Sequence, residues 1–186
     1  MLAYYESADG IRLLAPRGWN CQGAWGSEGG RLFLSPEPIP DTRSGFEGAA
    51  IEIDHFTSEA SGRYDVAETV ARVFPDYKAS AIRTLQDMEL PVPSGPYPTD
   101  TLRYRGKRIV EYETPAQTEG LGTFKSWLKR NDSPIVGAAI LILHPPNLIG
   151  FPPNVVLLSM RLPPDLARLA PTIVGYVERD YGDLPK

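Results

Sequence analysis

Two nearly continuous apolar runs mark the second half of the chain, at residues 134–144 and 154–162. Both have the length of β-strands and are rich in β-branched residues, which is the pattern of strands buried on both faces. An amphipathic run from Pro163 to Val177 follows and predicts a helix that packs on these strands. Pro171 within this run predicts either a kink or two shorter helices. The side chains expected to meet the sheet are Leu166, Leu169, Ile173, Val174 and Val177.

Three turns that contain glycine separate short strand patterns and so predict three β-hairpins. These turns lie at residues 9–10, 29–30 and 106. The strand patterns joined by the second and third turns are residues 21–25 with 31–35 and residues 101–105 with 107–114.

The middle of the chain combines one strand with one helical block. Residues 49–56 alternate apolar and polar positions from Ile51 onward, as expected for a half-buried strand. A helix is predicted to follow, because Asp65 can cap its first turn and Glu68 stands three residues on, as in a capping box. The apolar stripe of this helix is Val66, Val70, Val73 and Phe74.

Loops occupy much of the remaining chain, which contains 19 prolines and 17 glycines. The three longest loops are expected at residues 36–48, 91–100 and 115–122. Residues 77–90 fit either a second helical piece or a strand that begins near Ile82, and residues 123–129 predict a strand. The order of strands, helical block, strands and terminal helix predicts one α+β domain over residues 1–186. Its expected architecture is a twisted antiparallel sheet of about six to seven strands with helices packed on it, an α/β/α sandwich.

Charge and composition narrow the classes of partner and chemistry. The 186 residues carry a net charge of -4, and no run of Lys or Arg is longer than Lys129-Arg130, which argues against nucleic acid and anionic membranes. No apolar run reaches the roughly 18 residues of a membrane span. Cys21 is the single cysteine, so an internal disulfide is excluded, and this thiol is expected to pack in the core. No cofactor motif occurs, and no cofactor is expected.

The sequence is compatible with more than one cellular compartment. The first residues, Met1 to Ser7, have neither the basic nor the apolar segment of a secretory signal. We expect a periplasmic or secreted protein if a signal peptide has been removed, and a cytoplasmic protein otherwise.

The stretch from Gly10 to Trp19 contains a strand pattern, a proline and a Gly-Trp pair in succession. The chain resembles the Mog1/PsbP-like fold group at three places. These are this stretch, the strand that precedes the helix from Asp65, and the last strand, which runs into a terminal helix. The resemblance implies an α/β/α sandwich around a twisted antiparallel sheet. Because this group has scaffold, assembly and lipoprotein members without a shared active site, it implies binding rather than chemistry. The three long loops depart from the compact pattern of the group.

Catalysis would have to use the few suitable side chains that the chain contains. His55 and His144 are its two histidines, and each stands at the end of a predicted strand. If these strand ends met, Asp54, His55 and His144 could form the acid–base or metal site of a hydrolase, or line the pocket of a small-ligand carrier. No spacing motif supports such a site, so we prefer the interpretation that both histidines are solvated or hydrogen-bonded.

The favoured hypothesis is a non-catalytic domain that binds another protein, such as a bacterial envelope inhibitor, an immunity protein or an assembly factor. Loops stiffened by proline lose little entropy on binding, and aromatic side chains are enriched at interfaces. The expected partner-binding residues are Tyr97, Asp100, Glu113, Gln117, Glu119 and Trp127. A small ligand remains the alternative partner.

Overall fold

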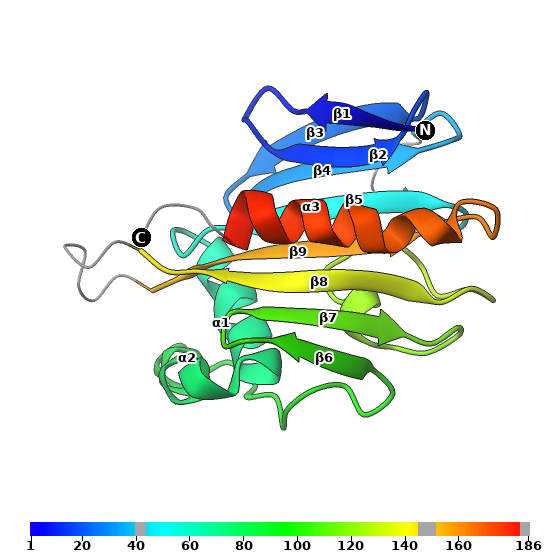
Figure 1. Cartoon of the computed structure of the whole chain (residues 1–186). Coiled ribbons are helices and arrows are strands. Elements are labelled where there is room, and N and C mark those ends of the chain that lie inside the picture. Colours follow the sequence, from blue (N-terminus) through cyan, green and yellow to red (C-terminus); the bar gives the residue numbers. More distant parts are fainter. Residues whose placement is uncertain (40–43, 145–151, 183–186) are drawn as a thin grey trace.

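The computed structural model describes residues 1–39, 44–144 and 152–182, which Figure 1 shows as a ribbon. The loop predicted over residues 36–48 and the Pro-rich loop after His144 lie partly outside these ranges. The strands are β1 (Leu2–Glu6), β2 (Arg12–Pro16), β3 (Asn20–Gly26), β4 (Gly29–Ser35), β5 (Ala50–Phe56), β6 (Thr101–Arg105), β7 (Ile109–Thr114), β8 (Ile135–Ile142) and β9 (Asn154–Arg161). The helices are α1 (Gly62–Val73), α2 (Lys78–Asp87) and α3 (Ala170–Gly182), with short 3-10 turns η2 (Pro75–Tyr77), η3 (Leu121–Thr123) and η4 (Ala167–Leu169).

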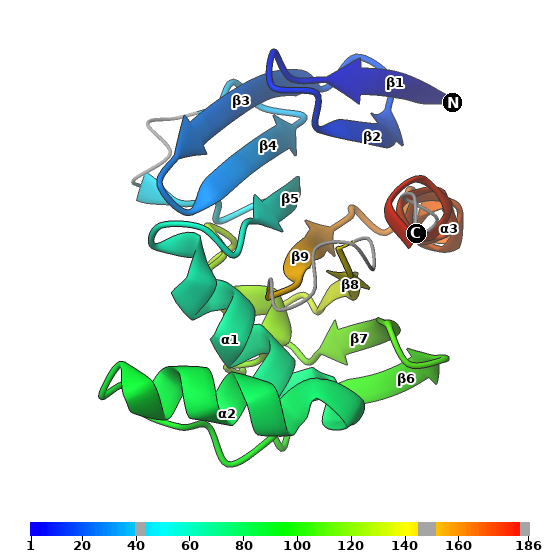
Figure 2. The ribbon, with the colours of Figure 1, turned by 90° about the vertical axis from the view of Figure 1, so that its left-hand side faces the viewer.

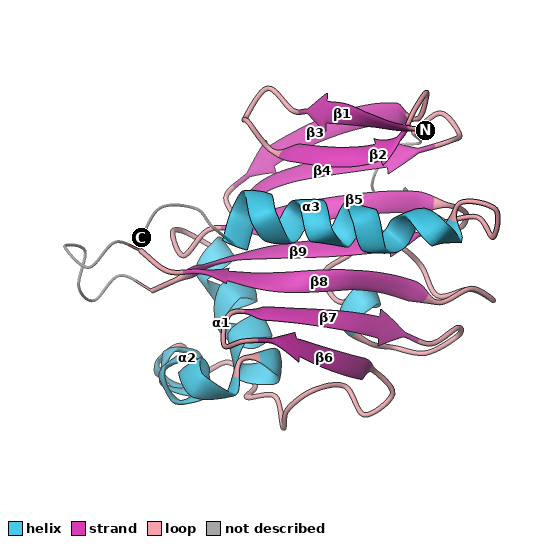
Figure 3. Ribbon diagram, in the orientation of Figure 1, coloured by secondary structure: helices cyan, strands magenta, loops and turns pink. Residues whose placement is uncertain are grey.

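Seven strands form one antiparallel sheet in the order β3-β4-β5-β9-β8-β7-β6, and β1 pairs with β2 in a separate hairpin (Figure 3). The three predicted hairpins are confirmed as β1–β2, β3–β4 and β6–β7. The turn predicted at residues 29–30 is misplaced, because Gly29 and Gly30 pair with β3 as the first residues of β4 and the turn lies at residues 27–28. Strand β9 pairs with both β5 and β8, which confirms that the two apolar runs form neighbouring strands inside the sheet. The two edges of the sheet are therefore β3 and β6.

Helices cover both faces of this sheet, which confirms the predicted α+β sandwich (Figure 2). Val155 and Leu157 of β9 pack in the apolar cluster beneath α1 and α2. Val156 and Leu158 point the other way and join α3 and the β1–β2 hairpin. Figure 2 also shows that α1 and α2 lie against the β5 to β6 part of the sheet, so no helix of the described ranges covers the same face of β3 and β4.

Helix α1 begins at Gly62, three residues before the predicted cap at Asp65. The prediction of a capping box is wrong, because the turn between β3 and β4 fixes the start of the helix. The backbone N–H of Gly62 donates to the carbonyl of Ser27 at 3.3 Å. A Cβ atom at position 62 would lie 2.3 Å from the carbonyl oxygens of Glu28 and Thr57, so glycine is required there. Asp65 instead lies buried in the first turn of the helix.

Replacing Gly62 by alanine is expected to lower the free energy of unfolding by about 3 kcal/mol, because two backbone oxygens would have to move away from the new methyl group. Gly175 in α3 provides a matched control, since a Cβ there would meet no atom within 4 Å. Gly175→Ala is expected to raise the free energy of unfolding by about 0.5–1 kcal/mol through helix propensity. Urea unfolding of both variants measures the two effects, and equal shifts would contradict the packing.

Three further segments sharpen or correct the sequence prediction. Residues 77–90 are mainly helical, as α2. The strand predicted over residues 123–129 is wrong, because among the described residues this segment pairs only through an isolated β-bridge between Leu128 and Phe46, and the N–H groups of Trp127 and Leu128 bond to side chains. Pro171 lies in the first turn of α3, where proline is tolerated, and so α3 starts near it without a kink.

The C-terminal helix packs as its sequence pattern predicts. Ile173 and Val177 are fully buried against the sheet, and Leu166, Leu169 and Val174 pack beside them. Within the described ranges no helix combines the length and the apolar character needed to cross a lipid bilayer.

Candidate functional site

Two carboxyl groups lie buried on strand β5, on the face of the sheet that also packs against α1. Glu52 and Asp54 are both 0% exposed, and residues two apart in a strand share one face. The prediction of a half-buried strand is therefore wrong for β5. Glu52 Oε2 accepts hydrogen bonds from the Ser126 hydroxyl and the Trp127 backbone N–H, both at 2.7 Å. The segment with Ser126 and Trp127, which precedes β8, thus covers the face of β5 that the alternating pattern predicts to be exposed to solvent.

Burial changes the protonation of this carboxyl pair. It raises the pKa of Glu52 to about 7, against the opposing effect of the hydrogen bonds from Ser126 and Trp127. Burial and the neighbouring Glu52 carboxylate also raise the pKa of Asp54 well above its usual range. Like charges on two neighbouring buried carboxyl groups disfavour joint ionisation, so this pair holds a proton to higher pH than exposed carboxyl groups do.

Arg31 of β4 connects this buried pair to the surface. In the sheet register it stands opposite Asp54, and its Nε lies 3.0 Å from Asp54 Oδ1. Its Nη2 lies 2.8 Å from Glu28 Oε2, in the turn between β3 and β4. The Arg31 side chain is 16% exposed, compared with 49% for Glu28. The guanidinium therefore has a buried carboxyl group behind it and an exposed carboxylate at the surface.

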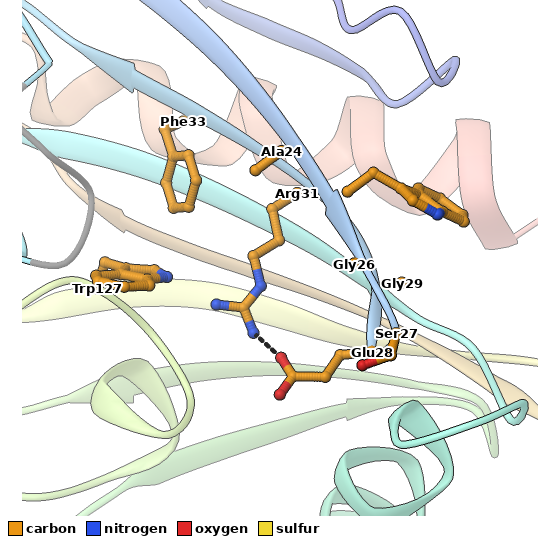
Figure 4. A pocket seen from close by; sticks show the side chains of 9 residues that line it. Ala24, Gly26, Ser27, Glu28, Gly29, Arg31, Phe33 and Trp127 are labelled. Atoms are coloured by element: carbon orange, nitrogen blue, oxygen red, sulfur yellow. Dashed lines mark hydrogen bonds and ion pairs between the residues drawn. The ribbon is translucent and has the colours of Figure 1, made fainter.

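A cavity of about 310 Å³ lies in front of Arg31 (Figure 4). Its aromatic wall is formed by Phe33 of β4 and by Trp127, whose ring centroids are 6.3 Å apart in an edge-to-face arrangement. The remaining wall is made by the end of β3 and the following turn, through Ala24, Trp25, Gly26, Ser27, Glu28 and Gly29. Because Glu52 holds the backbone of Trp127, the buried carboxyl pair positions both the guanidinium and one aromatic wall.

The cavity adjoins β3, one of the two edge strands of the sheet. Proteins commonly protect an exposed edge with charged side chains or proline. Edge strand β6 follows this rule, since Arg103 and Arg105 are two of its five residues. The seven residues of β3, Asn20–Gly26, include no charged residue and no proline. Among the described residues, edge β3 thus lacks both of these protecting residue types, and Trp25 on it is 61% exposed.

Cys21 also lies on β3, and its predicted place in the core is wrong because β3 is the last strand of the sheet. Its thiol is exposed. Partial burial raises the pKa of this thiol, so it is less readily ionised than an ordinary cysteine.

The suggested site of Asp54, His55 and His144 does not come together on one face. Asp54 points toward α1, with Glu52, whereas His55 follows it in the strand and points to the face of α3. His144 follows β8, two residues after its last residue. Among the described residues no group of three or more His, Cys, Asp or Glu side chains is arranged to hold a metal ion.

Tyr97 and Asp100, two of the predicted partner-binding residues, stabilise the loop that contains them. The Arg72 guanidinium lies over the Tyr97 ring, 4.1 Å from its centroid. Asp100 accepts hydrogen bonds from the Thr114 hydroxyl at 2.7 Å and from the Leu121 N–H at 2.8 Å. These contacts hold the Pro-rich loop against α1 and η3.

The other predicted partner-binding residues are distributed over the surface. Glu113 is exposed on β7, opposite Thr101, and Gln117 donates to Asp132 at 2.7 Å. The backbone carbonyl of Glu119 accepts a hydrogen bond from Thr99. Of the six predicted residues, Trp127 is the one that lines the cavity at Arg31.

A signal for this site is present in the sequence but needs the fold to be interpreted. Glu52 and Asp54 interrupt an otherwise apolar strand, and Arg31 interrupts a second one. Charged residues at such positions are either solvated or paired, and the sequence does not distinguish the two cases.

Comparison of the chain with protein-family profiles, curated proteins and solved structures gives no match. The resemblance to the Mog1/PsbP-like group therefore stays a prediction, and the site has to be interpreted from its own geometry.

Proposed function

We propose that this chain is a non-catalytic protein-binding domain that adds an extended segment of another protein to strand β3. The observation that carries the proposal is the contrast between the two sheet edges. Strand β6 carries two arginines, whereas β3 is uncharged, is seven residues long and presents an exposed tryptophan. An added strand would satisfy the outward N–H and C=O groups of such an edge, as in other β-augmentation complexes.

Trp25 is suited to anchor such a segment because its exposed ring lies against the neighbouring strand at Gly30. A Cβ atom on Gly30 would lie 2.7 Å from the ring, so the absence of a side chain at Gly30 lets the indole lie across the sheet. A rigid exposed aromatic group loses little entropy on binding, and tryptophan is among the residues most often found at binding hot spots.

The buried carboxyl pair supports a role in positioning rather than in catalysis. Glu52 and Asp54 are 0% exposed, so a substrate would not reach them without movement of the covering segments. In a binding domain their effect is to fix Arg31 and Trp127, as the supporting residues of a preformed site do.

Selection of random 12-residue peptides from a display library on the purified protein tests this proposal. The selected peptides are expected to bind about tenfold more weakly to Trp25→Ala. Tyr104→Ala is the matched control, since Tyr104 is 46% exposed on the opposite edge strand β6. It is expected to change the affinity by less than about twofold. No enriched peptide, or enriched peptides that bind both variants equally, would refute the proposal.

A further inference from the structure

The cavity beside β3 contains a hydrogen-bond donor group that the protein does not fully use. Arg31 Nε lies 3.0 Å from Asp54 Oδ1 as an ion pair, and Nη2 donates a hydrogen bond to Glu28 Oε2. Its Nη1 makes no hydrogen bond to any residue in the described part of the chain. Figure 4 shows the guanidinium in the middle of the cavity, between Trp127 and Glu28. A planar guanidinium in this orientation offers donors spaced for a carboxylate.

A second donor is available from the turn between β3 and β4. The Ser61 hydroxyl donates to Ser27 Oγ at 2.7 Å. The oxygen of Ser27 is thereby used as an acceptor, which leaves its own hydrogen free to donate. Ser27 lines the same cavity as Arg31.

Glu28 shows that the Arg31 guanidinium can bind a carboxylate on its solvent side. Its carboxylate reaches Arg31 from an exposed turn and is 49% exposed, whereas the Arg31 side chain is 16% exposed. A carboxylate from outside can replace it at small cost, because one carboxylate takes the place of another at the same guanidinium. Asp54, fixed behind the guanidinium, remains in contact with Nε during this exchange.

We infer that the cavity binds the carboxylate of an aspartate or glutamate side chain carried by the protein segment that pairs with β3. This inference deepens the proposed function and rests on it. Arg31 and the Ser27 hydroxyl donate to the carboxylate, and the Phe33 and Trp127 rings contact the methylene groups. Ala24 and Gly26 face the cavity from β3 without a bulky side chain, and a Cβ at Gly26 would meet no atom within 4 Å, so the approach from the edge is open.

The test uses two small probes that cannot form a strand, N-acetyl-glutamate N-methylamide and its glutamine counterpart. Each is titrated into the full chain while NMR records the Trp127 indole and Arg31 Nε–H signals. The glutamate probe is expected to bind with a Kd on the order of 10 mM, about fivefold more tightly than the glutamine probe. Equal affinities, or no saturable shift of either signal, would overturn the inference.

Two substitutions give effects of opposite sign. Glu28→Gln removes the competing carboxylate from an exposed turn and is expected to tighten binding of the glutamate probe about threefold. Arg31→Gln is expected to abolish the preference for glutamate over glutamine. If Arg31→Gln fails to fold, Glu28→Gln still tests the inference. An unchanged affinity for the glutamate probe in that variant would contradict displacement of the Glu28 carboxylate by the probe.

This experiment separates the inference from the proposed function. Loss of peptide binding at β3 together with glutamate-probe binding at Arg31 would refute the strand addition alone. Peptides that bind at β3 and show no preference for an acidic residue would refute the carboxylate site alone.

Discussion

Replacing Asp54 by asparagine is expected to stabilise the protein increasingly as the pH rises, with a gain relative to the wild type that grows by about 2 kcal/mol between pH 5 and pH 8. Burial raises the pKa values of Glu52 and Asp54. A carboxyl group with a raised folded-state pKa binds more protons in the native than in the unfolded state. Its presence therefore lowers the free energy of unfolding as the pH rises from the unfolded pKa toward the folded one.

In the Asp54→Asn variant one of the two titrating groups is absent, and the remaining carboxylate of Glu52 keeps its hydrogen bonds from Ser126 and Trp127. Urea unfolding at several pH values measures the effect. The difference in the free energy of unfolding between variant and wild type is compared at pH 5 and pH 8. Any loss of stability from the missing Arg31 contact that does not depend on pH cancels in this comparison. Glu28→Gln serves as the control at the exposed partner of the same arginine, and its effect should stay below about 0.5 kcal/mol at both pH values. Parallel pH profiles of Asp54→Asn and the wild type would contradict the buried pair.

Replacing Arg161 by methionine is expected to lower the free energy of unfolding by about 3 kcal/mol. Arg161 ends strand β9 and is 3% exposed. Its Nη1 donates to the carbonyls of Phe46, Glu47 and Gly48 at 3.1–3.4 Å, and its Nη2 donates to the carbonyl of Lys129. Methionine fills the space but leaves these carbonyl groups without their donor.

Loss of the Arg161 hydrogen bonds should also loosen the candidate site, because the segment that these bonds hold includes Trp127, one aromatic wall of the cavity. The N–H of Phe46 donates to the Trp127 carbonyl, and the N–H of Lys129 donates back to Phe46. Thermal unfolding and Trp127 NMR line widths measure both effects. Arg168→Met, at an exposed position in η4, is the control and should change the free energy of unfolding by less than about 0.5 kcal/mol. An Arg161→Met variant as stable as this control would contradict the network.

Short-range sequence patterns predict most of the fold. The hairpin at residues 9–10 follows from a turn signal between neighbouring strands, and the packing of Ile173 and Val177 follows from helical spacing. Such features depend on residues close in the sequence. The α+β class and the antiparallel sheet were predictable for this reason.

The candidate site depended on contacts between distant parts of the chain, which a local pattern does not contain. Glu52 is bonded by Ser126, 74 residues away in the sequence. Its alternation with Ile51 and Ile53 is the same in a solvated strand as in one covered by a later segment. For the same reason Cys21 was assigned to the core, since the edge position of β3 follows from the order of strands and not from its residues.

The most direct test of strand addition at β3 is amide hydrogen exchange of the protein with and without a selected peptide, followed by NMR. The proposal predicts that the peptide slows exchange of outward amides in β3, between Asn20 and Gly26, and leaves β6 between Thr101 and Arg105 unchanged. Slowed exchange elsewhere, with β3 amides exchanging as in the free protein, would contradict it.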